Sequence, residues 1–304
     1  MSDAGDFGAL NGTARRYATT AAFEAALKAR LAAQVTPSRT IQSLRKLLAF
    51  DRVLARLSHV APDAWLLKGG VALEYRLQRA RATTDIDIST RVDLETMTET
   101  LQDAATAELH DYFTMRLGER TKPAEDLDTY RFHVAVLYEN GRAFEELKID
   151  VGFADPWLGA PQKLTAAPLL DFAGIDPATV RAIPAEQHLA EKVHAYTRRY
   201  GHRESSRVKD LVDMALLVEE PLDLGFLAQA LGDVFRERAT HDVPVALPHP
   251  PARWRTIYAR LAADLPIPQT SDEAHRRVAN ALVGTLARAA SAQERERTAA
   301  ASTA

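Results

Sequence analysis

From Thr84 to Ser89, acidic and apolar side chains alternate along the chain. Asp85 and Asp87 take one set of positions, and Ile86 and Ile88 take the other. Successive side chains of a strand point to opposite faces, so this alternation predicts a strand with a buried isoleucine face. Its other face holds two carboxylates about 7 Å apart, which repel each other unless a cation lies between them. A lone Asp-x-Asp is more often a solvated surface feature, so its context decides between the two interpretations.

The segments around this strand predict a small mixed α/β unit. Trp65–Leu67 is a short apolar run, and residues 71–77 have the pattern of a short helix. Arg131–Tyr138 and Phe144–Phe153 read as two strands, and the Asn140-Gly141 turn between them is typical of a hairpin. The hairpin is expected to lie in the same sheet as the Asp-x-Asp strand.

Helical periodicity dominates both ends of the chain. Helices are predicted over residues 21–35, 38–60, 185–200, 206–219, 224–238, 252–263 and 271–290. The first 18 residues are interpreted as a loose arm, and the alanine-rich tail from residue 291 to 304 as a fraying end. The chain is therefore expected to be an α/β (α+β) protein. Its expected parts are an N-terminal arm with helices (1–60), a mixed-sheet core (61–165) and a C-terminal helical domain (166–304).

Composition excludes several kinds of site. The chain has no cysteine, so disulfides, thiolate-bound zinc and cysteine nucleophiles are ruled out. A formal net charge of -3 argues against a protein that merely coats nucleic acid, although a local basic patch remains compatible with it. No stretch resembles a transmembrane helix or a signal peptide, so we expect a cytoplasmic protein with no membrane partner.

Two further features strengthen the candidate site. Asp150 lies on the returning hairpin strand between Ile149 and Val151, where it could add a third carboxylate. Oxygen-only ligands suit Mg²⁺, with Mn²⁺ as the alternative, and three acids can hold two such ions beside a triphosphate. Gly69-Gly70 precedes a predicted helix whose N-terminus could bind phosphate, and Lys68 could add charge. Taken singly, the two glycines could be a simple turn and Asp150 an edge-strand charge.

The order of these features resembles a known family. The runs from Trp65 to Arg76 and from Arg81 to Ile88 resemble the AbiEii/AbiGii toxins, including the MenT toxins. These belong to the DNA polymerase β-like nucleotidyltransferase superfamily. Its pattern is a glycine turn, a helix, an Asp-x-Asp strand and a later aspartate on a strand. Gly69, Gly70, Asp85, Asp87 and Asp150 match these positions.

The family also carries a Glu-Lys helix and an Arg-x-x-Asp helix, which correspond here to Glu191-Lys192 and to Arg207 with Asp210. Lys192, Tyr196 and Arg199 share a predicted helix face that could hold a nucleotide. The competing interpretation is a solvated lysine on a helix that buries Tyr196. Asp210 could accept a hydrogen bond from Lys192 and fix its direction.

The resemblance implies a small mixed-sheet nucleotidyltransferase core that uses an NTP. The metal ligands would be Asp85, Asp87 and Asp150, and the catalytic residues would be these three with Lys192 and Asp210. The nucleotide-binding residues would be Lys68, Gly69, Gly70, Thr84, Lys192 and Arg207. Arg76 and Arg81, which flank the Asp-x-Asp, could steer the nucleotide or pair with surface acids.

The resemblance also implies an acceptor and a partner. AbiEii-like toxins resemble enzymes that add nucleotides to the 3′ end of tRNA, and a toxin of this kind implies a cognate antitoxin. The basic residues Arg198, Arg199, His202, Arg203, Arg207 and Lys209 could hold the tRNA backbone, or could form a solvated loop. Three alternatives stay open: a protein or small-molecule acceptor, a non-catalytic nucleotide- or RNA-binding module, and a purely structural interaction protein.

Overall fold

The computed structural model describes residues 15–36, 39–78, 81–122, 128–153, 155–198 and 207–302. The strands are β1 (Trp65–Lys68), β2 (Asp85–Thr90), β3 (Phe113–Thr121), β4 (Thr129–Tyr138), β5 (Ala143–Gly152), β6 (Gln162–Thr165) and β7 (Thr179–Ala182). The helices of the N-terminal half are α1 (Thr20–Ala33), α2 (Ile41–Val60), α3 (Gly69–Leu77) and α4 (Leu94–Thr106), followed by a 3-10 turn η1 (Asp171–Ala173). The remaining helices are α5 (Ala185–Thr197), α6 (Val208–Leu217), α7 (Leu224–Arg238), α8 (Trp254–Ala262) and α9 (Ser271–Ala301).

The strands form one mixed sheet in the order β3-β4-β5-β2-β1-β7-β6. The β2–β5 and β1–β7 pairs are parallel, and the other neighbours are antiparallel. The hairpin of β4 and β5 turns at Asn140-Gly141, as predicted, with Gly141 at a φ of +84°. The predicted mixed α/β fold is therefore confirmed.

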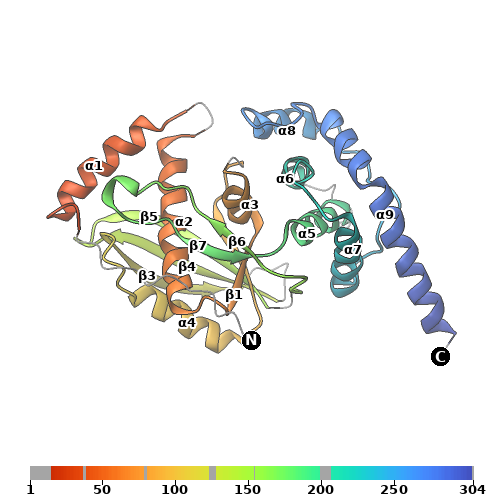
Figure 1. The fold of residues 1–304 in the computed structure, drawn as a ribbon, viewed down its shortest axis with the longest axis horizontal. Coiled ribbons are helices and arrows are strands. Elements are labelled where there is room, and N and C mark those ends of the chain that lie inside the picture. Colours follow the sequence, from red (N-terminus) through yellow and green to blue (C-terminus); the bar gives the residue numbers. More distant parts are fainter. Residues whose placement is uncertain are drawn as a thin grey trace.

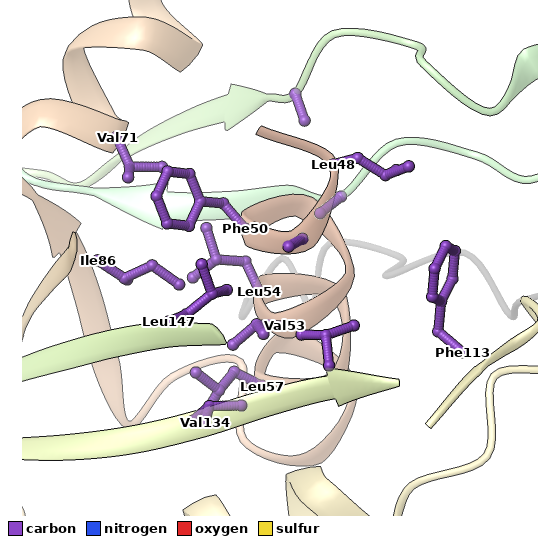
Figure 2. Packing of buried hydrophobic residues seen from close by; sticks show 14 of the residues in the cluster. Leu48, Phe50, Val53, Leu54, Leu57, Val71, Ile86, Phe113, Val134 and Leu147 are labelled. Carbon is purple, nitrogen blue, oxygen red and sulfur yellow. The ribbon is translucent and has the colours of Figure 1, made fainter. Parts of the chain in front are cut away.

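Helix α2 covers one face of the sheet, and Figure 1 shows it lying across the strands. Its apolar side chains Leu48, Val53, Leu54 and Leu57 are buried. Figure 2 shows this side of α2 facing apolar side chains of several strands, among them Ile86, Val134 and Leu147. Because Ile86 and Ile88 point into this core, the intervening aspartates of β2 lie on the opposite face.

A second apolar cluster holds the C-terminal helices together. It joins α5 to α9 and includes Leu73 of α3, whereas the first cluster extends along the chain only to Ala182. Helices α5 to α9 lie at one side of the sheet, and α9 reaches away from the body of the molecule (Figure 1). Strand β7 belongs to the sheet although it lies beyond residue 165, in the segment assigned from sequence to the helical domain, whereas β6 ends at Thr165, the last residue of the predicted core.

Both chain ends differ from expectation. The tail predicted to fray is helical to Ala301, because it consists of good helix formers and makes ion pairs such as Arg297–Asp242 and Arg236–Glu296. Residues 1–14 of the predicted arm lie outside the described residues. The end of that arm is anchored, since Arg15 pairs with Glu139 and the Tyr17 amide donates to the Tyr112 hydroxyl at 2.9 Å.

None of the helices in the described ranges is both long enough and apolar enough to span a bilayer.

Candidate active site

The three predicted acids lie on one face of two adjacent strands. Strands β2 and β5 pair in parallel with Asp87 directly opposite Asp150, and Asp85 opposite Lys148. Residues opposite each other in a sheet project to the same side, and so do residues two apart on a strand. The structure therefore brings Asp85, Asp87 and Asp150 together on the sheet face that α2 leaves uncovered.

The glycine turn lies against these acids. Lys68 ends β1 opposite Asp87, and α3 begins at Gly69, whose φ is +64°. A β-carbon at Gly69 would overlap the Asp87 carboxylate, and one at Gly70 would overlap the Thr83 side chain. The α3 N-terminus, with its free backbone N–H groups, is consequently held beside Asp87, in the arrangement that binds phosphate in other proteins.

The pKa of Asp87 is raised by its surroundings. Burial raises its pKa to about 6, against the lowering effect of Lys68 and Lys192, while the Asp150 and Asp85 carboxylates raise it further. A carboxylate that is desolvated and crowded by two others gains most when a cation is added nearby.

Asp150 has a partner that the sequence did not reveal. Arg131, directly opposite on β4, donates from Nε and Nη2 to the two carboxylate oxygens, at 2.7 Å each. This bidentate pair raises the pKa of Arg131 above its ordinary value. Arg131 thus fixes the orientation of Asp150 toward β4.

The donor set fits Mg²⁺ or Mn²⁺ in kind, because all three side chains are carboxylates on one rigid surface. Their present orientations are set by neighbours: Asp150 faces Arg131, and Asp85 accepts from the Thr84 hydroxyl at 3.0 Å. Within the described ranges no three histidine or acidic side chains already form a metal cage.

Lys68 is held differently from the prediction. Its ammonium pairs with Asp155, which also accepts from Arg238 of α7 at 3.1 Å. Burial lowers the pKa of Lys68, but Asp155 and Glu191 outweigh this effect and raise it. Lys68 stays charged and close enough to influence Asp87, and it ties the end of β1 to the helical part of the chain.

Lys192 is bound by two aspartates of α6. Its ammonium lies 3.2 Å from Asp210, as predicted, and 2.9 Å from Asp213. Asp213 is fully buried and also binds Arg81 in a bidentate pair, with both N–O distances 2.8 Å. Burial would raise the pKa of Asp213, but Lys192 and Arg81 lower it to about 2. Arg81 is therefore held by Asp213 rather than by a surface acid.

Other predicted residues fall outside this cluster. Arg207 precedes α6 with its Nε 3.9 Å from Asp210. Tyr196 is buried and donates to the Pro248 carbonyl at 2.8 Å, so it belongs to the packed side of α5 and not to a nucleotide-facing side. Arg76 donates to the Ile183 carbonyl at 2.8 Å. Arg199, His202 and Arg203 of the basic segment lie outside the described residues.

Gly69 offers a local test of this geometry. Replacing it with alanine adds a β-carbon where the Asp87 carboxylate lies, and it also adds the cost of a positive φ, about 1–2 kcal/mol. Gly141→Ala is the matched control, because Gly141 also has a positive φ but open space around it. We expect Gly69→Ala to lower the unfolding free energy more than Gly141→Ala does, and to weaken nucleotide binding, which Gly141→Ala should not. The contact between Gly69 and Asp87 would be contradicted if both variants lost the same unfolding free energy in chemical denaturation and the same nucleotide affinity in titration.

Comparisons with known proteins identify related chains. A family model described as "Nucleotidyl transferase AbiEii toxin, Type IV TA system" matches residues 52–282. Among solved structures, MenT4, a nucleotidyltransferase toxin from Mycobacterium tuberculosis H37Rv, superposes with a TM-score of 0.55. It is 18% identical, and the alignment covers 87% of this chain and 88% of that one. JHP933 from Helicobacter pylori is 15% identical with a TM-score of 0.44, covering 88% of this chain and 99% of that one. No curated protein sequence matches significantly.

Proposed function

Because this chain belongs to the AbiEii family of nucleotidyltransferase toxins from type IV toxin–antitoxin systems, we propose that it transfers nucleotides from an NTP to the 3′ end of tRNA and so blocks translation. The observation that supports transfer best is the register of β2 and β5. It sets Asp87 opposite Asp150, on the same sheet face as Asp85 and against the glycine turn of α3. The family also implies a cognate antitoxin.

Each group of residues has a role that follows from its position in the site. Asp85, Asp87 and Asp150 would hold divalent cations, and such ions would supply charge neutralisation at the triphosphate and a lower pKa for the acceptor hydroxyl. The backbone N–H groups at Gly69 and Gly70 hold the phosphates at the helix N-terminus. Transfer is then an in-line attack by the terminal hydroxyl on the α-phosphorus, with pyrophosphate leaving. The chain itself supplies orientation and charge.

Lys192 contributes a cation that is fixed in direction. Burial lowers its pKa, but Asp213 and Asp210 outweigh this and raise it, so the ammonium stays charged. It is close enough to lower the pKa of Asp87, which supports a role for Lys192 beside the acids. We assign Lys192 to the triphosphate, Asp210 to its orientation, and Thr84 and Arg207 to the rim of the nucleotide site.

The test is to incubate the full chain with Mg²⁺, total tRNA and each labelled NTP in turn. We expect label from one or more nucleotides to move into tRNA-sized product, and pyrophosphate to be released in equal amount. Periodate-oxidised tRNA, which lacks the 3′ diol, is the matched control and should accept nothing. Label in protein or in a small molecule would contradict the tRNA acceptor. Absence of pyrophosphate with every nucleotide and acceptor would contradict transfer itself.

A further inference from the structure

The sheet face that carries the acids continues beyond them as an open surface. From β2 the strands run to β5, β4 and finally β3, which is the edge of the sheet. On the opposite face, α2 and α4 cover these strands, since both helices contribute to the apolar core with them. The face of Asp85 and Asp87 has no such cover over β3 to β5, because Lys148, Arg116 and Gly118 are exposed there.

Three basic side chains form a row on this open face. Lys148 of β5 lies directly opposite Asp85, His133 of β4 lies directly opposite Lys148, and Arg116 of β3 lies opposite Ala135, two residues farther along β4. We call Lys148, His133 and Arg116 the sheet-face row. It begins beside the candidate metal ligands and ends at the edge of the sheet. Neighbouring strands lie about 4.8 Å apart, so the two strand spacings of the row cover about 10 Å, the length of about three stacked nucleotides.

The side chains of the row are not engaged within the chain. Some exposed arginines elsewhere are paired, for example Arg15 with Glu139, Arg142 with Glu24 and Arg297 with Asp242. In the described part of the chain, the side chains of Lys148, His133 and Arg116 have no hydrogen-bonding or ion-pair partner. A charge at Arg116 could be explained as protection of an edge strand against pairing with another chain. That explanation does not extend to Lys148, because β5 is an interior strand.

The residues between the members of the row have small side chains. Ala135 separates His133 from Arg116 in register, and Gly118 adjoins His133, so no large side chain stands between these members of the row. One acid interrupts the surface: Glu146 is exposed on β5, opposite Ala135 and two residues before Lys148. The Glu146 carboxylate therefore opposes binding of a polyanion at its own position. Removing its charge should strengthen binding, whereas removing the basic side chains of the row should weaken it.

We propose that the sheet-face row binds the phosphodiester backbone of the RNA acceptor and guides its 3′ end to the carboxylates. This deepens the proposed function and depends on it. A chain of phosphates matches a row of unpaired basic side chains that leads directly to the proposed site of attack, and phosphate contacts position a nucleic acid without reading its sequence. A folded protein acceptor would not need a row of basic side chains on an open sheet face.

The test measures binding of a fluorescently labelled single-stranded RNA to the full chain, without NTP, over a series of salt concentrations. Lys148→Ala/Arg116→Ala should weaken binding about tenfold at moderate salt and reduce the log–log salt slope by about 1.4, the value for two lost single-strand phosphate contacts. Glu146→Gln should tighten binding, a gain that misfolding cannot produce. Lys28→Ala/Arg295→Ala removes the same charges from exposed positions on α1 and α9, and should leave the slope unchanged.

Each outcome decides the proposal. A slope and affinity of Lys148→Ala/Arg116→Ala that equal those of the unmodified chain would overturn it, as would no RNA binding by the unmodified chain. Equal losses in the Lys28→Ala/Arg295→Ala control would overturn it too, because they would show a diffuse charge effect. Pyrophosphate release in the same preparations reports separately on nucleotidyl transfer. If release persists with some acceptor while the row variants bind RNA normally, the row fails and the transfer activity stands.

Discussion

Replacing Asp87 with asparagine is expected to reduce the rate of nucleotide transfer by about a thousandfold without weakening the fold. The substitution keeps the side-chain shape but removes the charge that would hold a cation, and a bound metal contributes several kcal/mol to stabilising the transition state. Burial and the neighbouring carboxylates raise the pKa of Asp87 to about 6, so its charge is unfavourable in the folded chain. Removing that charge should leave thermal stability unchanged or slightly higher.

The matched control is Asp103→Asn, the same substitution at an exposed position of α4. It should leave both the transfer rate and the melting temperature unchanged. Single-turnover assays with labelled nucleotide separate the chemical step from binding and product release. Full activity of Asp87→Asn would remove Asp87 from the mechanism, and a large fall in its melting temperature would mean that its charge is a structural requirement instead.

Replacing Asp213 with alanine is expected to destabilise the protein by about 3–5 kcal/mol, the usual cost of leaving buried charges uncompensated. Asp213 is fully buried and binds both Lys192 and Arg81, so the variant removes a carboxylate partner from two cations at once. Lys192 would also lose its closer anchor, so nucleotide affinity should fall in whatever protein remains folded. Urea denaturation and nucleotide titration measure the two effects. Asp242→Ala, which breaks the exposed pair with Arg297, should have little effect on either.

Asp213 also makes the stability of the folded chain depend on pH. The pKa of Asp213 is lowered to about 2 in the folded chain, so its stabilising effect is fully present above its ordinary value, near 4. That effect is lost progressively as pH falls from about 4 toward 2. The difference in stability between the unmodified chain and Asp213→Asn should therefore shrink over this range. A difference that stays constant would mean that Asp213 is not held as a carboxylate by Lys192 and Arg81.

The sequence predicted the parts of the fold that depend on local pattern. The alternation of Asp85–Ile88 and the Asn140-Gly141 turn each dictate their own backbone geometry, and the structure has both. The short strands β6 and β7 were not predicted, because four residues between proline- and glycine-containing loops carry too little periodicity. Strand β3 also escaped prediction, since its register shifts between Leu117 and Arg120 and its second half is exposed.

The candidate site was predictable only where a residue's role follows from its own segment. Asp85, Asp87 and Asp150 could be grouped because each lies on a predicted strand, whereas their partners come from distant positions. Arg131 lies 19 residues from Asp150, and Arg81 lies 132 residues from Asp213. The hairpin register could have revealed Arg131, since pairing outward from Asn140-Gly141 aligns it with Asp150. No local signal connects Arg81 to Asp213, because that contact depends on how the helices pack against the sheet.

The most direct test of the central claim is a crystal structure of the full chain with Mn²⁺ and a non-hydrolysable NTP. The carboxylates of Asp85, Asp87 and Asp150 should surround an anomalous scattering peak, with the triphosphate oxygens beside the backbone N–H groups of Gly69 and Gly70. Manganese and triphosphate located away from these three acids, with Asp150 still fully bound to Arg131, would contradict the account.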